Sequence, residues 1–343
     1  MQLAKKTLIV CGILIALGAV GFFIYLSRTI LIFILVALIL AIAINPLVIR
    51  LKRLKMGRVW ASVVAIILLL IILIGIMAVI ITPLVSQGIV LAQNLPEITH
   101  KLLANPTFSS WNEKFHFADY LNQLSDNASS LLLGGGASVF SIATNVITIV
   151  SSIGIILVLT FLLLIEGGGI WRQLLQFTTK ENGVIAQRVR GRIMKAVSGF
   201  VSGNLFISLI AGVVTFITLW ILGVPYKFTL AALVALFDLV PLIGTAIATI
   251  VVGLVALTKG VVVAVISVAI LLFYQFIEGH IIQPVVYSRS INLSALLIVV
   301  ASLIGAEIAG ITGILLAIPV AAVVQILAIE TYTLFKNREH ILH

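Results

Sequence analysis

The chain has 343 residues, of which 62% are hydrophobic and only 9% are charged, and its mean hydropathy is +1.30. Soluble domains carry about 25% charged residues, so this composition excludes an ordinary soluble protein and indicates an integral membrane protein. The formal net charge of +10 does not indicate nucleic-acid binding, because the basic residues lie in short stretches beside apolar segments.

Apolar stretches follow one another along the whole chain. A helix needs about 20 apolar residues to cross a hydrocarbon core of about 30 Å. The first stretch follows Lys5 and Lys6 without a convincing cleavage site, so we expect a retained helix and not a signal peptide. The sequence predicts an all-α, polytopic transmembrane helical bundle with two segments broken or re-entrant. About eight apolar segments are expected, at 7–26, 30–49, 59–82, 137–165, 196–222, 228–257, 260–277 and 294–335.

The basic residues predict an orientation. If the N-terminus is cytoplasmic and each stretch crosses once, most Lys and Arg residues fall on one side, as the positive-inside rule requires. Both termini are then cytoplasmic. The residues on that side are Lys5, Lys6, Arg50, Lys52, Arg53, Lys55, Arg58, Arg172, Lys180, Arg188, Arg190, Arg192, Lys195, Lys259, Lys336 and Arg338.

Two non-spanning stretches complete the organisation. Residues 83–136 carry more acidic than basic residues and show helical apolar spacing, which predicts an extracytoplasmic amphipathic insertion, with a substrate-recognition loop as the alternative. Residues 166–195 are basic and amphipathic, and we expect them to rest in the lipid headgroup layer. The predicted domains are transmembrane helices one to three (1–82), the insertion (83–136) and a transport core with broken segments (137–343).

The stretch 228–257 contains a carboxylate and two helix breakers. Pro241 lacks an N–H, and Gly244 adds backbone freedom. An ionised carboxylate such as Asp238 costs about 3 kcal/mol at bilayer depth, so it normally marks a polar cavity or an ion path. We expect this stretch to cross the membrane with a break, although a re-entrant hairpin would reverse the side of every later loop.

The stretch 294–335 is longer than one span requires and is also interrupted. Its breakers are expected at Gly305, Gly310, Gly313 and Pro319, with the carboxylate of Glu307 among them. Paired interrupted segments are the best sequence indication of a transporter site, because half-helix ends present unpaired backbone groups near the midplane. We therefore hypothesise that Gly244 and Gly305 mark two breaks that face one polar pathway.

A polar cluster lies between the two interrupted stretches. Gln275, Glu278 and Gln283 could coordinate a cation or bind a polar solute, and Pro284 is a further helix break. His280 could shuttle protons, but the wet end of a helix explains it better. For Asp238 and Glu307, a structural carboxylate that accepts hydrogen bonds from freed N–H groups is the competing interpretation.

Enzyme signatures are absent from the positions where they would be expected. The chain has no Gly-x-x-x-x-Gly-Lys-Ser/Thr loop for ATP and no His-Glu-x-x-His zinc helix, so we expect no enzyme, no metal site and no cofactor. A coupling ion, Na⁺ or H⁺, is compatible with the carboxylates. The lone cysteine, Cys11, excludes an intramolecular disulfide.

Three motifs in order resemble the autoinducer-2 exporter family of bacterial membrane proteins. Phe237-Asp238-Leu-Val-Pro241-Leu-Ile-Gly244 resembles that family's apolar-Asn-x-x-Pro-x-x-Gly segment. Ile282-Gln283-Pro284 resembles its Gln-Pro stretch, and Gly310-Ile-Thr-Gly313 through Pro319-Val resembles its Gly-x-x-Gly segment. The chain departs from the pattern with Asp238 where Asn is common and Thr245 where Pro is common.

The resemblance implies a permease of the bacterial cell inner membrane that is homo-oligomeric and exports a small solute without ATP. The expected function is therefore secondary transport of a small polar solute such as the autoinducer-2 signal, with membrane lipid as the surroundings and no nucleic-acid partner. Some members look like sodium/proton antiporters, and the extra carboxylate of Asp238 makes that alternative relevant here. A non-transporting membrane scaffold is the alternative of another class.

Overall fold

Long helices make up the part of the chain that the computed structural model describes, which is residues 18–19, 21–75, 77–79, 137–240, 244–287 and 293–342. No strand occurs in these ranges. The described helices are α2 (Arg28–Arg53), an unlabelled helix Arg58–Val79, α6 (Ala137–Gln176), α7 (Lys180–Ile221), α8 (Lys227–Asp238), α9 (Gly244–Leu257), α10 (Val261–Ile277), the π-helical turn η1 (Glu278–Ile282), α11 (Gln283–Tyr287) and α12 (Ala295–Leu342).

Six of the described helices are long and apolar enough to cross a membrane, and α9 is a shorter apolar helix. The prediction of a polytopic helical bundle is therefore confirmed. The predicted helix 7–26, apart from its last residues, and the insertion 83–136 lie outside the described residues, as do Cys11 and Pro241. Large apolar side chains such as Phe206, Leu209 and Phe273 are more than half exposed, which is stable only where lipid replaces water.

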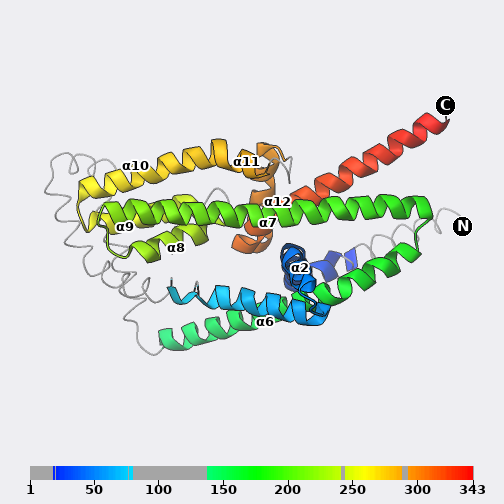
Figure 1. The fold of residues 1–343 in the computed structure, drawn as a ribbon, viewed down its shortest axis with the longest axis horizontal. Coiled ribbons are helices and arrows are strands. Elements are labelled where there is room, and N and C mark those ends of the chain that lie inside the picture. Colours follow the sequence, from blue (N-terminus) through cyan, green and yellow to red (C-terminus); the bar gives the residue numbers. More distant parts are fainter. Residues whose placement is uncertain are drawn as a thin grey trace, which may run out of the picture.

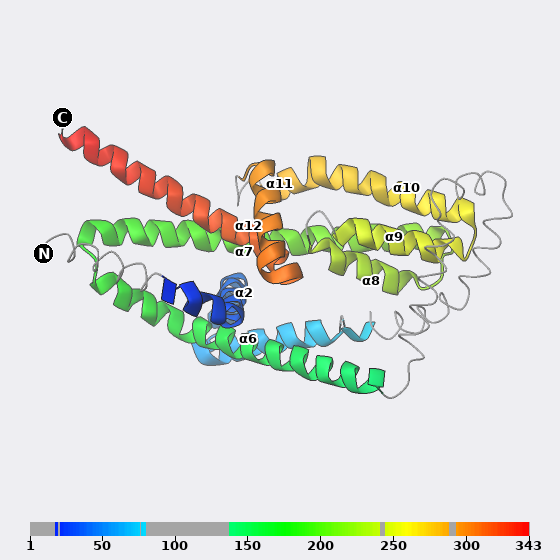
Figure 2. The same cartoon turned by 180° about the vertical axis from the view of Figure 1, so that it is seen from behind.

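The helix α7 organises the C-terminal half of the protein. Its 42 residues give a length of about 60 Å, well beyond a hydrocarbon core of about 30 Å. The second half of α7 packs with α8, α9 and α10 around an apolar core that includes Leu219, Leu230, Val252 and Leu271. Figures 1 and 2 show these four helices side by side.

The helices α8 and α9 form a hairpin. At the start of α8, the Phe228 ring lies 4.5 Å from that of Phe216 near the end of α7, and at its end Asp238 reaches Ser208 further back on α7. The chain then reverses its direction into α9. Thr249, in the first half of α9, accepts a hydrogen bond from Gln275 near the C-terminal end of α10. Lys227 and Lys259 therefore lie at the same end of the bundle (Figure 1).

The expectation that 228–257 crosses the membrane in one direction is therefore wrong. At 12 and 14 residues, α8 and α9 are about 18 and 21 Å long, too short to span separately. Antiparallel packing lets them bury Leu233 and Val234 of α8 with Ala248 and Val252 of α9 in one core. Lys259 consequently moves to the side of Lys227, away from the basic side on which single crossings placed it.

The helix α12 is also folded into two arms. Ala309 and Gly310 leave the helical conformation, and Gly310 has φ +57°, a left-handed value that favours glycine. Beyond this kink the arms lie against each other, because a Cβ on Gly305 would overlap the Gly313 carbonyl and a Cβ on Gly313 would overlap the Gly305 carbonyl. Eight residues apart in a straight helix, they would be separated by about 12 Å.

The expected break at Pro319 is wrong. Ala309 and Gly310 are the residues of α12 with non-helical dihedral angles, whereas Pro319 is fully buried inside the continuous second arm. A proline removes one backbone hydrogen bond, and a membrane helix tolerates this loss where neighbouring helices cover the freed carbonyl.

The basic stretch 166–195 is packed against protein and does not merely rest on lipid. It contains the end of α6 and the start of α7, and the apolar residues Ile193 and Val197 meet Ile39 of α2 and Leu316 of α12. On the neighbouring face, the guanidinium of Arg192 lies 2.8 Å from Glu330 of α12, with Arg188 at 3.9 Å. These contacts add tertiary packing to the stretch, and its position in the headgroup layer stays a prediction.

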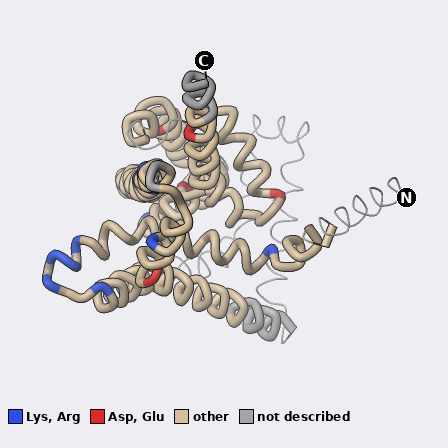
Figure 3. The backbone as a smooth tube through the Cα atoms, turned by 90° about the vertical axis from the view of Figure 1, so that its right-hand side faces the viewer, with Lys and Arg blue, Asp and Glu red and all other residues tan. Residues whose placement is uncertain are grey.

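Lys and Arg residues gather in the connection between α2 and the helix Arg58–Val79 (Figure 3). Arg58 joins this connection to α6, because its Nε donates a 2.8 Å hydrogen bond to the Leu164 carbonyl. A second core around Val48, Ala61 and Leu164 holds the three helices together.

Cysteine labelling tests the α8–α9 hairpin. In a Cys11→Ser background, Tyr226→Cys and Lys259→Cys should react with a membrane-impermeant maleimide from the same side, because both residues lie at the same end of the bundle. Phe177→Cys, which is 90% exposed at the other end of α7, should react from the opposite side. Labelling of Tyr226→Cys and Lys259→Cys from opposite sides would show a single crossing.

Substitution of Gly313 tests the folded α12. Gly313→Ala should destabilise the protein by about 1–3 kcal/mol, the usual range for overpacking, because the new methyl group meets the Gly305 backbone. The matched control is Gly154→Ala in α6, where a Cβ meets nothing within 4 Å. Thermal loss of the monodisperse chromatographic peak in detergent measures the difference, and equal midpoints for both variants would contradict the close approach.

Candidate functional site

Two carboxyl groups are buried together inside the bundle of α7, α8, α9 and α10. Asp238, the last residue of α8, is 5% exposed, and Glu278, the first residue of the π turn η1, is 6% exposed. The two groups are close enough for each to affect the charge of the other. Burying two like charges side by side is strongly unfavourable, so the pair requires a proton, a cation or hydrogen-bond donors as compensation.

Protein donors satisfy only half of this pair. The Ser208 hydroxyl donates to Asp238 Oδ2 at 2.7 Å, and the Gln283 amide donates to Glu278 Oε1 at 2.9 Å. The other oxygens, Asp238 Oδ1 and Glu278 Oε2, are buried without a geometrically acceptable hydrogen-bond partner among the described residues, and so is the hydroxyl of the neighbouring Tyr274. Buried polar atoms are nearly always paired, so these three atoms require a proton shared within the cluster, or a bound ion or solute, to complete their hydrogen bonds.

Irregular backbone brings the two carboxyl groups together. The helix α8 ends at Asp238, and the chain continues into α9 at Gly244, where a Cβ would overlap the Phe237 carbonyl. On the other side, α10 widens into the π turn Glu278–Ile282, and the helix then continues through Pro284 in α11, so the expected break at Pro284 is a π turn and not an interruption. Single π turns inside α-helices occur frequently at functional sites, and the wider turn gives room for the proline ring.

A second layer of hydrogen bonds fixes the surroundings. Asn204 of α7 donates to the Leu239 carbonyl at 3.2 Å and accepts from the Tyr287 hydroxyl at 2.9 Å. The helix α11 can approach α7 this closely because Gly203 has no side chain at the contact with Tyr287. Gln275 donates to Thr249 at 2.7 Å and so ties α10 to α9. Each irregular segment at the site is therefore anchored to a regular helix.

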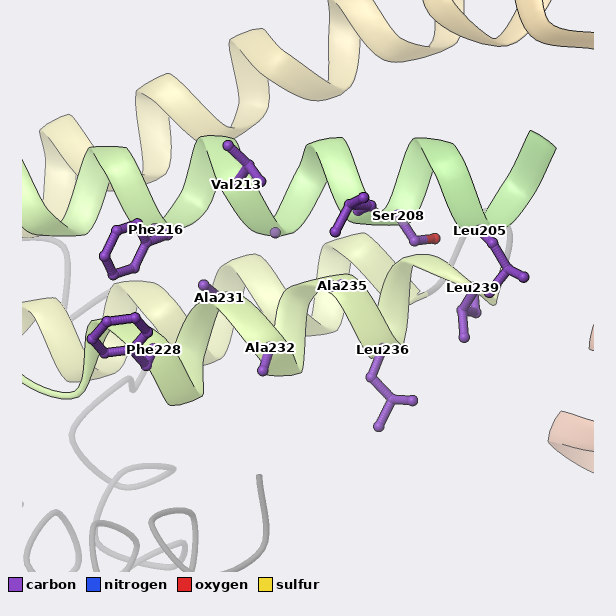
Figure 4. Close-up of a pocket in the computed structure, with 12 residues that line it drawn as sticks. Leu205, Ser208, Val213, Phe216, Phe228, Ala231, Ala232, Ala235, Leu236 and Leu239 are labelled. Carbon is purple, nitrogen blue, oxygen red and sulfur yellow. The ribbon is translucent and has the colours of Figure 1, made fainter. Parts of the chain in front are cut away.

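Two apolar hollows flank this layer. One, of about 410 Å³, lies between α7 and α8, and Ser208 is its polar lining residue (Figure 4). The other, of about 700 Å³, lies between α9 and α10, with Thr249 and Gln275 among its lining residues. Because Ser208 also binds Asp238, the first hollow reaches the immediate neighbourhood of the carboxyl pair.

The structure brings together some of the residues predicted from the sequence. Asp238, Glu278 and Gln283 form the centre of the cluster, and Gln275 belongs to the adjoining hydrogen-bond network. Gly244 begins the helix directly beyond Asp238. These residues come from five separate elements that the sequence alone does not place beside one another.

Other predicted residues lie elsewhere. Glu307 is exposed on the first arm of α12, and no hydrogen bond or ion pair joins it to the carboxyl pair within the described ranges. Gly305, Gly310 and Gly313 form the fold of α12 itself, so the hypothesis that Gly244 and Gly305 line one pathway has no supporting contact. His280 is exposed and stacks on Phe276 with the ring centroids 4.2 Å apart.

Sequence reasoning missed Ser208, Asn204, Tyr274 and Tyr287. A signal was present for the first two, because they lie four residues apart on α7 and therefore share one face of an otherwise apolar helix. Tyr274 immediately precedes Gln275, but a tyrosine in an apolar helix carries no distinct signal until its hydroxyl is seen to be buried.

Comparison with known proteins agrees with the fold and its motifs. The model of the family described as AI-2E family transporter matches residues 13–333. YrrI of Bacillus subtilis (strain 168), which carries a transport-protein name, is 37% identical over 38% of this chain and 37% of its own length. MT0215 of Mycobacterium tuberculosis (strain CDC 1551 / Oshkosh), also named for transport, is 30% identical over 57% of this chain. The chain therefore matches about half, 53%, of the length of MT0215 and less of YrrI.

A longer but weaker similarity extends over the complete bundle. The AI-2 transport protein TqsA of Escherichia coli (strain K12) is 24% identical over 96% of this chain and 91% of its own length. The family match covers the membrane helices and the carboxyl pair alike. The chain belongs to the AI-2E family of transporters, multi-pass membrane proteins of helical fold.

Proposed function

We propose that this protein is a secondary transporter that moves a small polar solute along a path through the Asp238–Glu278 pair. The observation that carries the proposal is the burial of two interacting carboxyl groups whose outer oxygens, with the Tyr274 hydroxyl, have no hydrogen-bond partner among the described residues. Ionisable groups at membrane depth are costly and normally mark substrate or ion pathways. Membership of a transporter family supports this assignment.

The chemistry of the pair favours a solute rich in hydroxyl groups. Carboxyl oxygens accept hydrogen bonds, and the Tyr274 hydroxyl can donate or accept, so a polyol-like solute would satisfy all three free atoms. The C-terminal end of α8 and the N-terminal end of α9 also meet near this point, and they present carbonyl and N–H groups respectively. A signal molecule of the AI-2 kind, named for the relative TqsA, is the first solute to test, in the export direction.

A proton or Na⁺ is the proposed coupling ion. Two adjacent buried carboxyl groups hold a shared proton or a cation more easily than two bare charges, so solute binding and ion binding compete or cooperate at one place. No observation in the described residues favours exchange of Na⁺ for H⁺ as the main activity. No additional cofactor is proposed.

The basic end of the molecule is proposed to face the cytoplasm of a bacterial inner membrane. The connection after α2, the end of α6 and the beginning of α7 carry the basic clusters, and the second arm of α12 joins them through Glu330. The opposite end carries Lys227 and Lys259. The positive-inside rule assigns the richer end to the cytoplasm.

Flux through purified protein in liposomes tests the proposal. With AI-2 as the solute, Asp238→Asn and Glu278→Gln should each reduce uptake or release by at least about tenfold, because removing a hydrogen bond to a charged group costs about 1.5–3 kcal/mol. Imposed proton and sodium gradients identify the coupling ion through the gradient that drives flux.

The matched control is Glu307→Gln, which removes an exposed carboxylate of the same length and should leave flux near the unsubstituted level. Equal flux for the unsubstituted protein and Asp238→Asn would remove the pair from the mechanism. Absence of flux with AI-2 and with a series of small polyols, under every gradient, would favour a membrane scaffold in which the carboxyl pair serves assembly alone.

A further inference from the structure

A third hollow lies away from the carboxyl pair, where α2, the helix Arg58–Val79, α6 and α7 meet. Its volume is about 350 Å³. Two guanidinium groups, those of Arg58 and Arg190, line it, together with Asn45 and the indole of Trp171. The rest of the lining is apolar and includes Ala41 and Leu164. A hollow with a cationic rim and an apolar wall suits an amphipathic anion.

Arg58 is held in a fixed position at this rim. Its Nε donates to the Leu164 carbonyl at 2.8 Å, and its terminal nitrogen lies over Gly168, where a Cβ would be only 3.2 Å away. A glycine inside a helix costs about 1 kcal/mol relative to alanine, and here its missing side chain leaves room for the guanidinium. Among the described residues, the other N–H groups of Arg58 have no hydrogen-bond partner.

Arg190 is fixed from the other side. Its guanidinium lies 5.3 Å from the centre of the Trp171 ring, which is a cation–π distance. The Trp171 indole N–H is buried without a hydrogen-bond partner among the described residues. Two arginine side chains and the Trp171 side chain thus line the same small volume, and the unpaired indole N–H is buried beside it.

No carboxylate neutralises these two arginines within the described ranges. Glu166 directly precedes the lining residue Gly167, but it is not itself a lining residue and makes no ion pair with either arginine among the described residues. Glu330, near the lining residue Leu327, pairs with Arg192 and Arg188 on a different face of α7. Neither Arg58 nor Arg190 makes an ion pair with a described residue, in contrast to Arg188 and Arg192. The hollow therefore has an excess of positive charge and of donors.

The position of the hollow relative to the membrane indicates the source of an anion. Arg58 is the first residue of an apolar helix that is long enough to cross the bilayer, so the basic connection that precedes it is expected at the membrane–water boundary. Tryptophan and arginine are typical of the headgroup level, and basic pockets between membrane helices bind anionic lipid headgroups. Guanidinium groups bind the oxygen atoms of phosphate through two parallel hydrogen bonds.

We propose that this hollow binds the phosphate group of an anionic phospholipid from the leaflet on the basic side. Arg58, Arg190 and the Trp171 N–H bind the phosphate oxygens, and the glycerol end lies against the apolar wall. Bound there, the lipid joins α6 and α7 to α2 and the helix that follows it.

Native mass spectrometry of the full chain in detergent tests this site. Phosphatidylglycerol, titrated against phosphatidylcholine with the same acyl chains, should remain bound at lower concentrations. The double variant Arg58→Gln/Arg190→Gln should weaken phosphatidylglycerol retention by at least about tenfold, since hydrogen bonds between charged groups are lost. Arg53→Gln is the matched control, because Arg53 belongs to the same basic connection but does not line the hollow.

Three results would overturn the proposal. Equal retention of phosphatidylglycerol by the double variant and the control would show that general surface charge holds the lipid. Equal retention of both lipids by the unsubstituted protein would exclude recognition of the anion. Displacement of the lipid by millimolar inorganic phosphate would assign the hollow to free phosphate. If the double variant does not remain monodisperse, Arg190→Gln alone decides, because Arg190 makes no hydrogen bond to the backbone of the described residues.

Discussion

The contact between Asp238 and Glu278 is the interaction on which the arrangement of the C-terminal half depends. Each carboxyl group is almost fully buried, and each has one protein donor, Ser208 or Gln283. To bring the groups together, α8 must end inside the bundle, α9 must return beside it, and α10 must widen into a π turn. A bundle built only for anchoring would gain stability by replacing the pair with apolar side chains. The protein nevertheless keeps this destabilising carboxyl pair, and that is the physical argument for a functional role.

The regular helices supply the rigidity that this cost requires. The core around Leu219, Leu230 and Val252 holds α7, α8 and α9 in place, and the Gln275–Thr249 hydrogen bond joins α10 to them. Asn204 holds the chain after α8 and the end of α11 at the same time. The polar centre is therefore irregular in backbone but anchored at each helix that surrounds it, which is the construction expected of a site in a broken membrane helix.

Composition and apolar run length were sufficient to predict the helical membrane bundle, because the bilayer thickness fixes the length of a spanning helix. The sequence also indicated Asp238 and Glu278 as candidate site residues, since carboxylates are costly in apolar surroundings. The return of α9 beside α8 could not be predicted, because a short apolar arm shows the same sequence pattern whether it re-enters the membrane or crosses it. Pro319 shows the same limit: the sequence contains the breaker, but burial against neighbouring helices decides whether the helix breaks there. The glycines beside Glu307 indicated a break that lines a polar pathway, but they serve the fold of α12 instead.

The most direct test of the account is the coupling free energy between Asp238 and Glu278. Unfolding free energies of the unsubstituted protein, Asp238→Asn, Glu278→Gln and the double variant, measured in mixed micelles by denaturing-detergent titration, form a double-mutant cycle. Either single change removes the repulsion between the groups and the double variant cannot remove it twice, so we expect a departure from additivity of more than about 0.5 kcal/mol. Additive effects within that margin would show that the two carboxyl groups do not meet, and would contradict the site as described.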